Sequence, residues 1–315
     1  MEERWGDMCK LFIIGNGFDL FHGIPTKYED FKEYLQMQYP DAIDKEFNVP
    51  TVEIGHRGDI EFDIDEVVSY LIDLISRTEG TLWKNLEKSL GELNFNYDFY
   101  CLPNMYDKDG DRNLWHEAYN NEDLSENLAS IVPVILELFY NWIQTIDITK
   151  HKASPEVKSL IDAKKDYFIS FNYTRTLEEL YGVKDVCHIH GVQGGEEKIF
   201  FGHGAGFRFD ENNTSKYTGC ESGLEKIQNA LRKDTEGALR EHKNFFEKLG
   251  KSISSIYSYG FSFGEVDLIY LKEIFKIVNT KETTFYLHNY DKTLHSTNKR
   301  IICNCGFHGV FNTFG

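Results

Sequence analysis

The chain alternates short apolar runs with longer amphipathic segments. Lys10–Ile14 ends in four consecutive apolar residues and is followed directly by Gly15, a pattern typical of a strand buried on both faces. Similar runs return after residue 165, and helical segments separate most of them. The other expected strands are Tyr167–Phe171, Val186–Ile189, Lys198–Phe201, Ser255–Tyr259 and Thr283–Leu287, and the expected helices are Thr176–Tyr181, Ser222–Leu249 and Val266–Val278. This alternation predicts an α/β fold with a doubly wound, mainly parallel sheet and helices on both faces.

The middle of the chain has a different pattern. Apolar residues repeat there at helical spacing, at Val67, Val68, Tyr70, Leu71, Leu74 and Ile75. Leu128–Ile146 is a second long helix candidate, with a kink expected at Pro133. Nothing in this region alternates as a strand would. We therefore expect a core made of residues 1–40 and 155–315, interrupted by a mainly helical insertion at 41–154.

Charge and composition narrow the class of protein. The 315 residues include 34 basic and 51 acidic ones, which gives a net charge of −17. Non-specific nucleic-acid binding and docking on anionic lipid both need a basic face, so we expect neither. Six cysteines are too few for a disulfide scaffold. The N-terminal residues lack the pattern of a secretory signal, and Leu128–Ile143 is interrupted by polar residues, so we expect a cytoplasmic protein without a membrane span.

A glycine-rich segment follows the first expected strand. Gly15 and Gly17 bracket Asn16, and Phe18 and Asp19 follow. Glycines at this position allow a tight turn and the close approach of backbone N–H groups to a phosphate. The G-x-G-x-x-G fingerprint is incomplete because Leu20 takes the third glycine's place, so an ordinary structural turn is the alternative. Thr26 with Glu29 forms a capping-box pattern that predicts a helix start.

Three more segments could carry chemistry at strand ends. Asn172 follows the second expected strand, where α/β sheets bind ligands, although an asparagine helix cap is the alternative. His188 and His190 are expected on one face of a strand, beside Gly191. An imidazole exchanges protons near neutral pH and suits a general base, but buried histidines also serve structural roles.

The last of these segments contains Gly260, Ser262 and Asp267, and it lies between an alternating strand and an amphipathic helix. It suits a ribose or nucleotide, or else an ordinary connection. Cys303, Cys305 and His308 lack the paired spacing of a zinc ribbon, and no HExxH motif, nucleophile elbow or Walker A loop is present. We expect no metal.

Four segments, taken in order, resemble the bacteriophage abortive-infection AbiH family. They are IIGNGFDLFHGIPTKYEDF at 13–31, ISFNYTRTLEELYG at 169–182, HIHG at 188–191 and YGFSFGEVD at 259–267. That family is in turn similar to the sirtuin-like nucleotide-binding group, especially to antiphage proteins that hydrolyse NAD. The resemblance implies a Rossmann-like, sirtuin-like fold with a nucleotide pocket.

The resemblance also implies roles for residues at matching motif positions. Gly15, Gly17 and Asp19 would line the pyrophosphate and ribose, and Ser262 would lie near the adenosine. Asn172 would orient the nicotinamide ribose, and His190 would act as the base. The complete expected site has Asn172, His190 and Asp19 as catalytic residues, with nucleotide contacts from Gly15, Asn16, Gly17, Phe18, Thr26, Gly191, Gly260, Ser262 and Asp267.

Some positions depart from the pattern of the sirtuin-like group. Thr174 stands where many members carry an aspartate, and Asp19 replaces a serine. The four-cysteine zinc module of sirtuin deacetylases is missing from the sequence, which argues against protein deacylation.

The resemblance implies an antiphage NAD(P) glycohydrolase that needs no cofactor and takes NAD or a related nucleotide as its substrate. In cleavage of the nicotinamide–ribose bond, Asn172 would position a water or hydroxyl, His190 would accept a proton and Asp19 would stabilise the cationic ribose. Its partners would be the nucleotide and a phage or host trigger protein, and a homo-oligomer stays open. The first alternative is a non-catalytic module that senses a nucleotide such as ADP-ribose. The second is a helical insertion that recognises a phage or host component, with a vestigial pocket.

Overall fold

The structure is a computed structural model that describes residues 9–44, 48–56, 59–80, 82–196, 198–204, 216–250 and 253–315. Contacts within the chain divide it into two compact units. The first, the sheet unit, comprises Met1–Thr26, Ile143–Phe200 and Asp234–Gly315. The second, the helical unit, comprises Lys27–Trp142 and Phe201–Lys233. These boundaries differ from the expected insertion at 41–154: the helical unit begins earlier, ends earlier and includes a second, later stretch of chain.

Six parallel strands form the sheet of the sheet unit. They are β1 (Cys9–Ile14), β4 (Tyr167–Ser170), β5 (Cys187–His188), β6 (Ile253–Tyr259), β7 (Thr284–His288) and β8 (Val310–Phe314). Their order across the sheet is β5-β4-β1-β6-β7-β8. Counted along the chain within this sheet, the order is 3-2-1-4-5-6, which is the Rossmann order. The order reverses between β1 and β6, and sheets of this kind bind ligands outside the carboxyl ends of the strands at that point.

Five of the six expected strands are confirmed, and one is wrong. Lys198–Phe201 is not a strand: the Phe200 N–H donates to the His190 carbonyl at 2.9 Å, so the segment folds back on the loop after β5. The sequence did not predict β8, because this edge strand mixes apolar and polar residues and is largely exposed. The expected helix Thr176–Tyr181 is confirmed as α9.

The other expected helices after residue 200 are more divided than the pattern indicated. Ser222–Leu249 is three helices, α11 (Glu221–Ala230), α12 (Thr235–Glu241) and α13 (Lys243–Lys248). Asp234 starts the second of them, because its carboxylate accepts a hydrogen bond from the Gly237 N–H at 2.8 Å. A 3-10 turn, η2 (Glu265–Asp267), precedes α14 (Leu268–Ile277).

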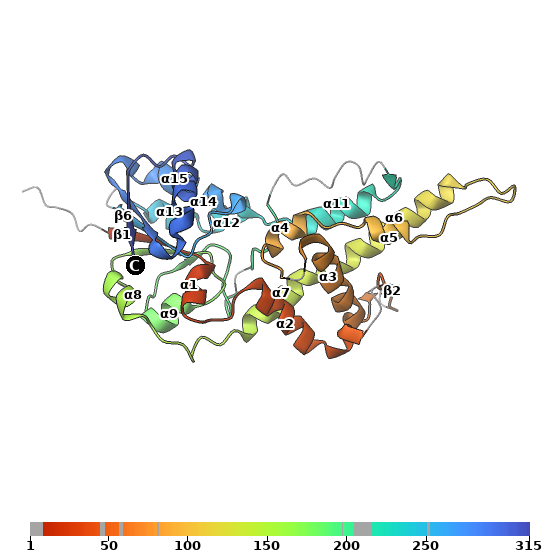
Figure 1. Cartoon of the computed structure of the whole chain (residues 1–315), viewed down its shortest axis with the longest axis horizontal. Helices are drawn as coiled ribbons and strands as arrows, with labels where there is room; N and C mark the ends of the chain where they lie inside the picture. The colour runs from red at the N-terminus through yellow and green to blue at the C-terminus, as the bar shows by residue number, and fades with distance from the viewer. Residues whose placement is uncertain are drawn as a thin grey trace, which may run out of the picture. The chain divides into compact units, whose positions relative to one another are not determined.

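Helices cover both faces of the sheet (Figure 1). One face packs against α12, α13, α14 and α15 (His295–Asn304) through a core that includes Ile13, Ile169 and Ile256. The other packs against α1 (Asn16–Phe21), α8 (Pro155–Leu160) and α9. The elements η3 (Thr280–Glu282) and η4 (Asn289–Leu294) flank β7. The doubly wound arrangement predicted from the sequence is therefore confirmed as a six-stranded parallel α/β sheet.

The helical unit has its own core. Its elements are α2 (Tyr28–Gln38), η1 (Pro40–Asp44), β2 (Glu53–Ile54), β3 (Ile60–Glu61), α3 (Ile64–Glu79), α4 (Leu86–Gly91), α5 (Asn96–Tyr100), α6 (Leu114–Ile131), α7 (Val134–Thr145) and α11. The expected interruption at Pro133 is confirmed, since it lies between α6 and α7. The small antiparallel β2–β3 hairpin was not predicted. Phe31, Trp83 and Phe139 pack edge to face at the centre of the unit.

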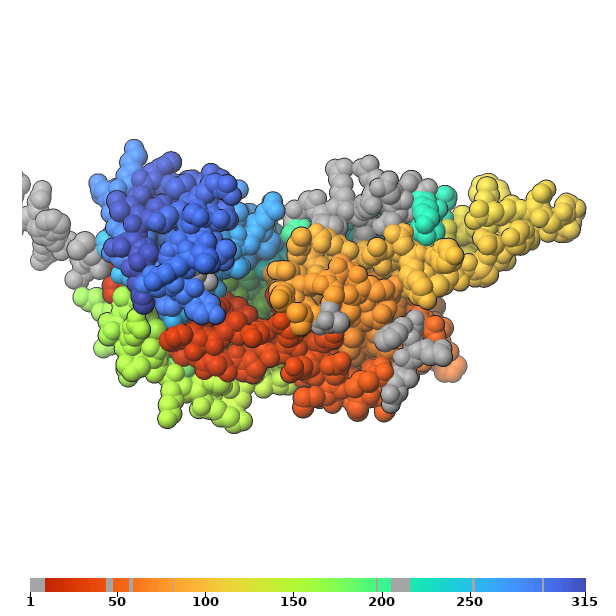
Figure 2. Space-filling model, viewed as in Figure 1, coloured from red at the N-terminus to blue at the C-terminus, as the bar shows by residue number. Residues whose placement is uncertain are grey.

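The segment Leu114–Thr145, which includes α6 and α7, is 32 residues long and apolar enough to cross a bilayer by length and composition. In the structure, 44% of its most apolar stretch is buried inside the protein. Core helices of soluble proteins can be equally long and apolar, so this segment is weak evidence for a membrane span. The first turns of α6, yellow in Figure 2, lie on the visible surface of the helical unit. Leu114 and Trp115 are exposed there.

The loops after β1 and β6 touch through their backbones. Gly15 N–H donates to the Tyr259 carbonyl and Gly17 N–H to the Gly260 carbonyl, both at 3.0 Å. Gly260 has a φ of +66°, and a Cβ there would lie 2.4 Å from the Phe18 nitrogen. Only glycine allows both the backbone conformation and this approach. The contact sets the start of α1 against the carboxyl end of β6.

Gly260→Ala should therefore lower the free energy of unfolding by about 2–4 kcal/mol, combining left-handed strain with a steric clash. Gly182→Ala is the matched control, because Gly182 has a φ of +69° and open space around its Cβ position. The control should cost only about 1 kcal/mol of backbone strain. Urea unfolding of both variants tests this, and equal losses would contradict the steric argument.

Candidate functional site

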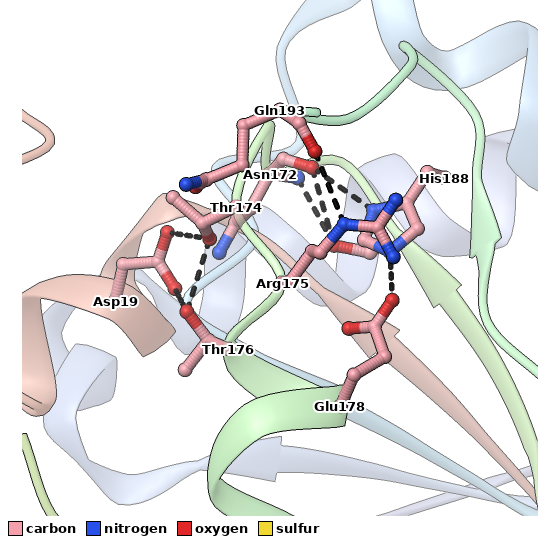
Figure 3. Close-up of polar contacts among 9 residues, drawn as sticks. Asp19, Asn172, Thr174, Arg175, Thr176, Glu178, His188 and Gln193 are labelled. Carbon is pink, nitrogen blue, oxygen red and sulfur yellow. Dashed lines mark hydrogen bonds and ion pairs between the residues drawn. The ribbon is translucent and has the colours of Figure 1, made fainter. Parts of the chain in front are cut away.

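The candidate site is built around a buried carboxylate at the carboxyl ends of β1 and β4. Asp19 lies on α1 and is 1% exposed. Its Oδ2 accepts a hydrogen bond from the Thr174 hydroxyl at 2.6 Å, and its Oδ1 accepts one from the Thr176 hydroxyl at 2.7 Å (Figure 3). The two hydroxyls are themselves 3.0 Å apart. These bonds join α1 to the loop between β4 and α9.

The surroundings of Asp19 change its acidity. Burial removes water from the carboxylate and raises the pKa of Asp19 to about 6, while hydrogen bonds from Thr174 and Thr176, the nearby side-chain amide of Asn172 and the charge of His188 act in the opposite direction. A carboxyl group with this pKa can gain or lose a proton close to neutral pH. Such shifts occur often, though not only, at functional sites.

Asn172 lies beside this carboxylate and is 5% exposed. The Asn172 N–H donates to the Ser170 hydroxyl at 3.2 Å. Neither Nδ2 nor Oδ1 of its side chain completes a hydrogen bond within the described residues. The N-terminal cap of α9 is Arg175, so Asn172 is not the helix cap that was considered as an alternative. A buried amide in this state is energetically costly unless water or a ligand completes it.

The two histidines do not share a strand face, and that prediction is wrong. The strand β5 ends at His188, and the Gly191 N–H donates to the His188 carbonyl at 2.9 Å in the turn that follows. Gly191 has a φ of +80°, which glycine allows. The regular alternation of side chains therefore stops before His190 is reached.

Each histidine has a different carboxylate partner. His188 Nε2 is 2.7 Å from Glu178 Oε1, and its Nδ1 is 3.4 Å from the Asn172 carbonyl oxygen. His190 is 2% exposed, and its Nε2 is 3.3 Å from Asp267 Oδ1. The His190 ring packs against Phe171 and Tyr270, which belong to the core on the α14 side of the sheet. The structure thus groups His188 with Asn172 and Asp19, and groups His190 with Asp267.

The glycine loop, residues 15–17, uses its backbone N–H groups for hydrogen bonds within the protein. The N–H groups of Gly15 and Gly17 donate to the loop after β6, as described above. Asn16 and Thr26 bond to each other, since the Thr26 hydroxyl donates to Asn16 Oδ1 at 2.6 Å and Asn16 Nδ2 to the Thr26 carbonyl at 2.8 Å. Phe18 is fully buried in the core beside α9.

The capping box expected from Thr26 and Glu29 is wrong by one residue. The helix α2 has Lys27 at its N-cap, and Asp30 Oδ2 accepts the Lys27 N–H at 2.7 Å. Thr26 is engaged by Asn16 instead. In the loop after β6, Ser262 is exposed, while Phe263 is buried with a φ of +56°, which is rare for a bulky residue. No cluster of three or more metal-ligating side chains occurs among the residues described.

Comparison with known proteins agrees with the resemblance found in the sequence. A family model described as bacteriophage abortive infection AbiH matches residues 11–289. The chain belongs to the AbiH family. This membership supports a role in abortive-infection defence against bacteriophage. No curated protein and no solved structure matches the chain in the same comparisons.

In this AbiH protein, three site side chains were missed as members of the site. In the sequence, Thr174 stands out only as a departure from the sirtuin-like pattern, and Thr176 and Glu178 fall within an expected helix. The spacing of Asn172, Thr174 and Thr176 is the signal that could have found two of them, because alternate residues after a strand can point the same way. Nothing in the sequence indicates that Glu178 pairs with His188.

The Asp19 carboxyl should make stability depend on pH. Its pKa rises from 3.8 to about 6 on folding, so between these values the folded protein holds a proton that the unfolded chain has lost. The contribution of Asp19 to stability is therefore greatest below pH 3.8 and is lost as the pH rises through 6. From pH 4 to pH 7, the free energy of unfolding should fall on the order of 3 kcal/mol relative to Asp19→Asn.

Urea unfolding of the wild type and of Asp19→Asn at both pH values measures this difference. The matched control is Asp185→Asn, which makes the same change at an exposed position before β5. The control should not reproduce the fall. A wild-type difference from Asp19→Asn that stays constant with pH would contradict the assignment.

Proposed function

We propose that this AbiH protein is a cytoplasmic antiphage enzyme that hydrolyses NAD(P) or cleaves a closely related nucleotide. It would bind the nucleotide in a sirtuin-like pocket. The observation that carries the proposal is the pair formed by Asp19 and Asn172. A carboxyl group with a pKa of about 6 lies beside a buried amide without a hydrogen-bond partner among the described residues. Both are at the carboxyl edge of a sheet with Rossmann strand order, which is where such sheets bind nucleotides.

The proposed reaction is hydrolysis of the nicotinamide–ribose bond. The C1′–N bond breaks, and its electron pair goes to the nicotinamide nitrogen, so nicotinamide leaves as a neutral molecule. Water adds to C1′, its proton passes to a base, and ADP-ribose is the second product. The transition state resembles an oxocarbenium ion with positive charge on the ribose.

Each proposed role follows from the character of the group. Ionised Asp19 would stabilise the cationic ribose, because a negative charge in a water-poor site acts strongly on a developing positive charge. Asn172 would hold the water or a ribose hydroxyl in line. His190 is the proposed base. It pairs with Asp267 rather than with Asp19 and Asn172, so it would have to approach the bound water when the site opens, and Asp267 would stabilise the imidazolium that forms.

The burial of these groups bears on when the enzyme would act. Asp19, Asn172 and His190 are 1%, 5% and 2% exposed, so substrate cannot reach them in this conformation. Activity would therefore require an opening that exposes these three side chains. A phage or host trigger protein is the proposed cause of that opening.

Asn172→Ala should lower the rate of nicotinamide release at least about 10²-fold, because the reacting water or hydroxyl loses its positioning group. The measurement is nicotinamide release from NAD in phage-infected cells and with protein purified from them. Asn304→Ala, an exposed change at the end of α15, is the control and should leave the rate unchanged. Full activity in both Asn172→Ala and His190→Ala would refute the assigned roles.

A second candidate function is non-catalytic sensing of a nucleotide such as ADP-ribose. The observation that favours it is Thr174, whose hydroxyl donates to Asp19 at the position where the sirtuin-like group carries a carboxylate. The site would then have one acidic group fewer for catalysis. Calorimetry showing tight ADP-ribose binding, together with an unchanged NAD level in infected cells, would select this function over hydrolysis.

A further inference from the structure

Arg175 has an unusual environment beside the candidate site. It lies between β4 and α9 and is partly buried. Its Nε donates to the Gln193 carbonyl at 3.1 Å (Figure 3). Neither of its terminal guanidinium nitrogens has a hydrogen bond or a carboxylate partner within the described part of the chain.

Arg77 in the helical unit is a partly buried arginine with a contrasting environment. Its Nε is 2.7 Å from Asp73 Oδ2, and its two terminal nitrogens donate to the Asp98 carboxylate at 3.2 and 3.3 Å. All three nitrogens of that guanidinium thus face acidic side chains. Arg175 is also partly buried, but it has no acidic partner among the described residues.

The position of Arg175 is held by a series of hydrogen bonds. The Gln193 N–H donates to the Tyr173 carbonyl at 2.7 Å, and Gln193 Nε2 donates to the Ile146 carbonyl at 3.0 Å. These bonds fix the Gln193 carbonyl that receives Arg175 Nε. The planar guanidinium is thereby oriented in advance, which lowers the entropy cost of binding a ligand.

Two more residues of the loops after β4 and β5 have buried side-chain polar atoms without hydrogen-bond partners among the described residues. These atoms are Gln193 Oε1 and both polar atoms of the Asn172 side chain. In Figure 3 the Asn172 side chain points toward Asp19 and Thr174, while the Arg175 side chain extends to the other side of the same loop. An oriented cation on loops that also carry buried amides without hydrogen-bond partners indicates a site for an anionic, hydrogen-bonding ligand.

We propose that Arg175 binds a phosphate group of the nucleotide ligand, so that the site selects phosphorylated nucleotides over nucleosides. This inference rests on the proposed function for the identity of the ligand. A guanidinium presents two parallel N–H donors that match two phosphate oxygens.

The glycine loop gives an independent reason to look for such a group. In many Rossmann-like sites, backbone N–H groups after the first strand neutralise the phosphates. Here the N–H groups of Gly15 and Gly17 are bonded to the loop after β6, and Asp19 adds a buried acid nearby. The phosphate charge therefore needs a cation, and Arg175 is suited to supply it.

The test is calorimetric titration of the full-length protein with ADP-ribose, inorganic pyrophosphate and adenosine. Wild-type protein should bind ADP-ribose more tightly than adenosine. Arg175→Gln should weaken ADP-ribose binding roughly 10- to 100-fold, which corresponds to the loss of charged hydrogen bonds, and should leave adenosine binding unchanged. Arg175→Lys should recover part of the loss, because it keeps the charge without the planar fork.

The matched control is Arg240→Gln, the same substitution at an exposed arginine of α12, which should not alter ADP-ribose binding. Pyrophosphate binding equal to that of ADP-ribose would identify a free phosphate as the ligand chemistry and would still require Arg175. The proposal is overturned if wild-type protein binds neither phosphorylated ligand. It is also overturned if Arg175→Gln leaves ADP-ribose binding unchanged or weakens adenosine binding equally.

These outcomes separate the inference from the proposed function. Binding of ADP-ribose that depends on Arg175, without any nicotinamide release in infected cells, would keep the phosphate site and reject hydrolysis. Nicotinamide release that depends on Asn172 but not on Arg175 would keep hydrolysis and reject the phosphate site.

Discussion

The contact between the backbones of the loops after β1 and β6 is the constraint on which the candidate site depends. Gly17 and Gly260 approach too closely for either to carry a side chain, and this approach sets α1 against the end of β6. The position of α1 in turn places Asp19 opposite Thr174 and Thr176. The sequence predicts that Gly15 and Gly17 approach a phosphate. In the structure, their N–H groups instead bond the loop after β1 to the loop after β6.

The buried carboxylate shows a conflict between stability and function. Removing water from Asp19 costs free energy, and two threonine hydroxyls compensate only part of it, as its raised pKa shows. Natural proteins keep such groups where the chemistry needs them more often than where the fold does. The neighbouring Asn172 amide, buried without a partner among the described residues, adds a second cost at the same place. The two together distinguish this region from the rest of the sheet edge.

The two histidines show that the directions of side chains in a motif depend on where the strand ends. In H-I-H-G, an extended backbone would place both imidazoles on one face. The turn at Gly191 stops the strand at His188, and each imidazole then faces its own carboxylate, Glu178 or Asp267. The same four residues thus supply polar groups to two sets of neighbours.

The sequence by itself determined the class of the fold and several members of the site. Strands buried on both faces are mostly apolar, so β1 and β4 could be recognised, and β6 could be recognised from its alternating pattern. The alternation of these strands with helices predicted a parallel sheet. The edge strand β8 could not, because exposure permits polar residues there. Asn172 was identifiable because it follows an apolar strand at the carboxyl edge of the sheet, whereas Asp19 was identified through the resemblance to the sirtuin-like group.

Only the tertiary structure decided which of these groups meet. Asp19 and Thr174 are 155 positions apart in the chain, and His190 and Asp267 come from loops after different strands. Such pairings depend on where each strand ends and on the conformation of the loop that follows it. The local sequence pattern predicts neither. The division of the chain into a sheet unit and a helical unit has the same origin, since residues 201–233 join the helical unit through packing rather than through sequence position.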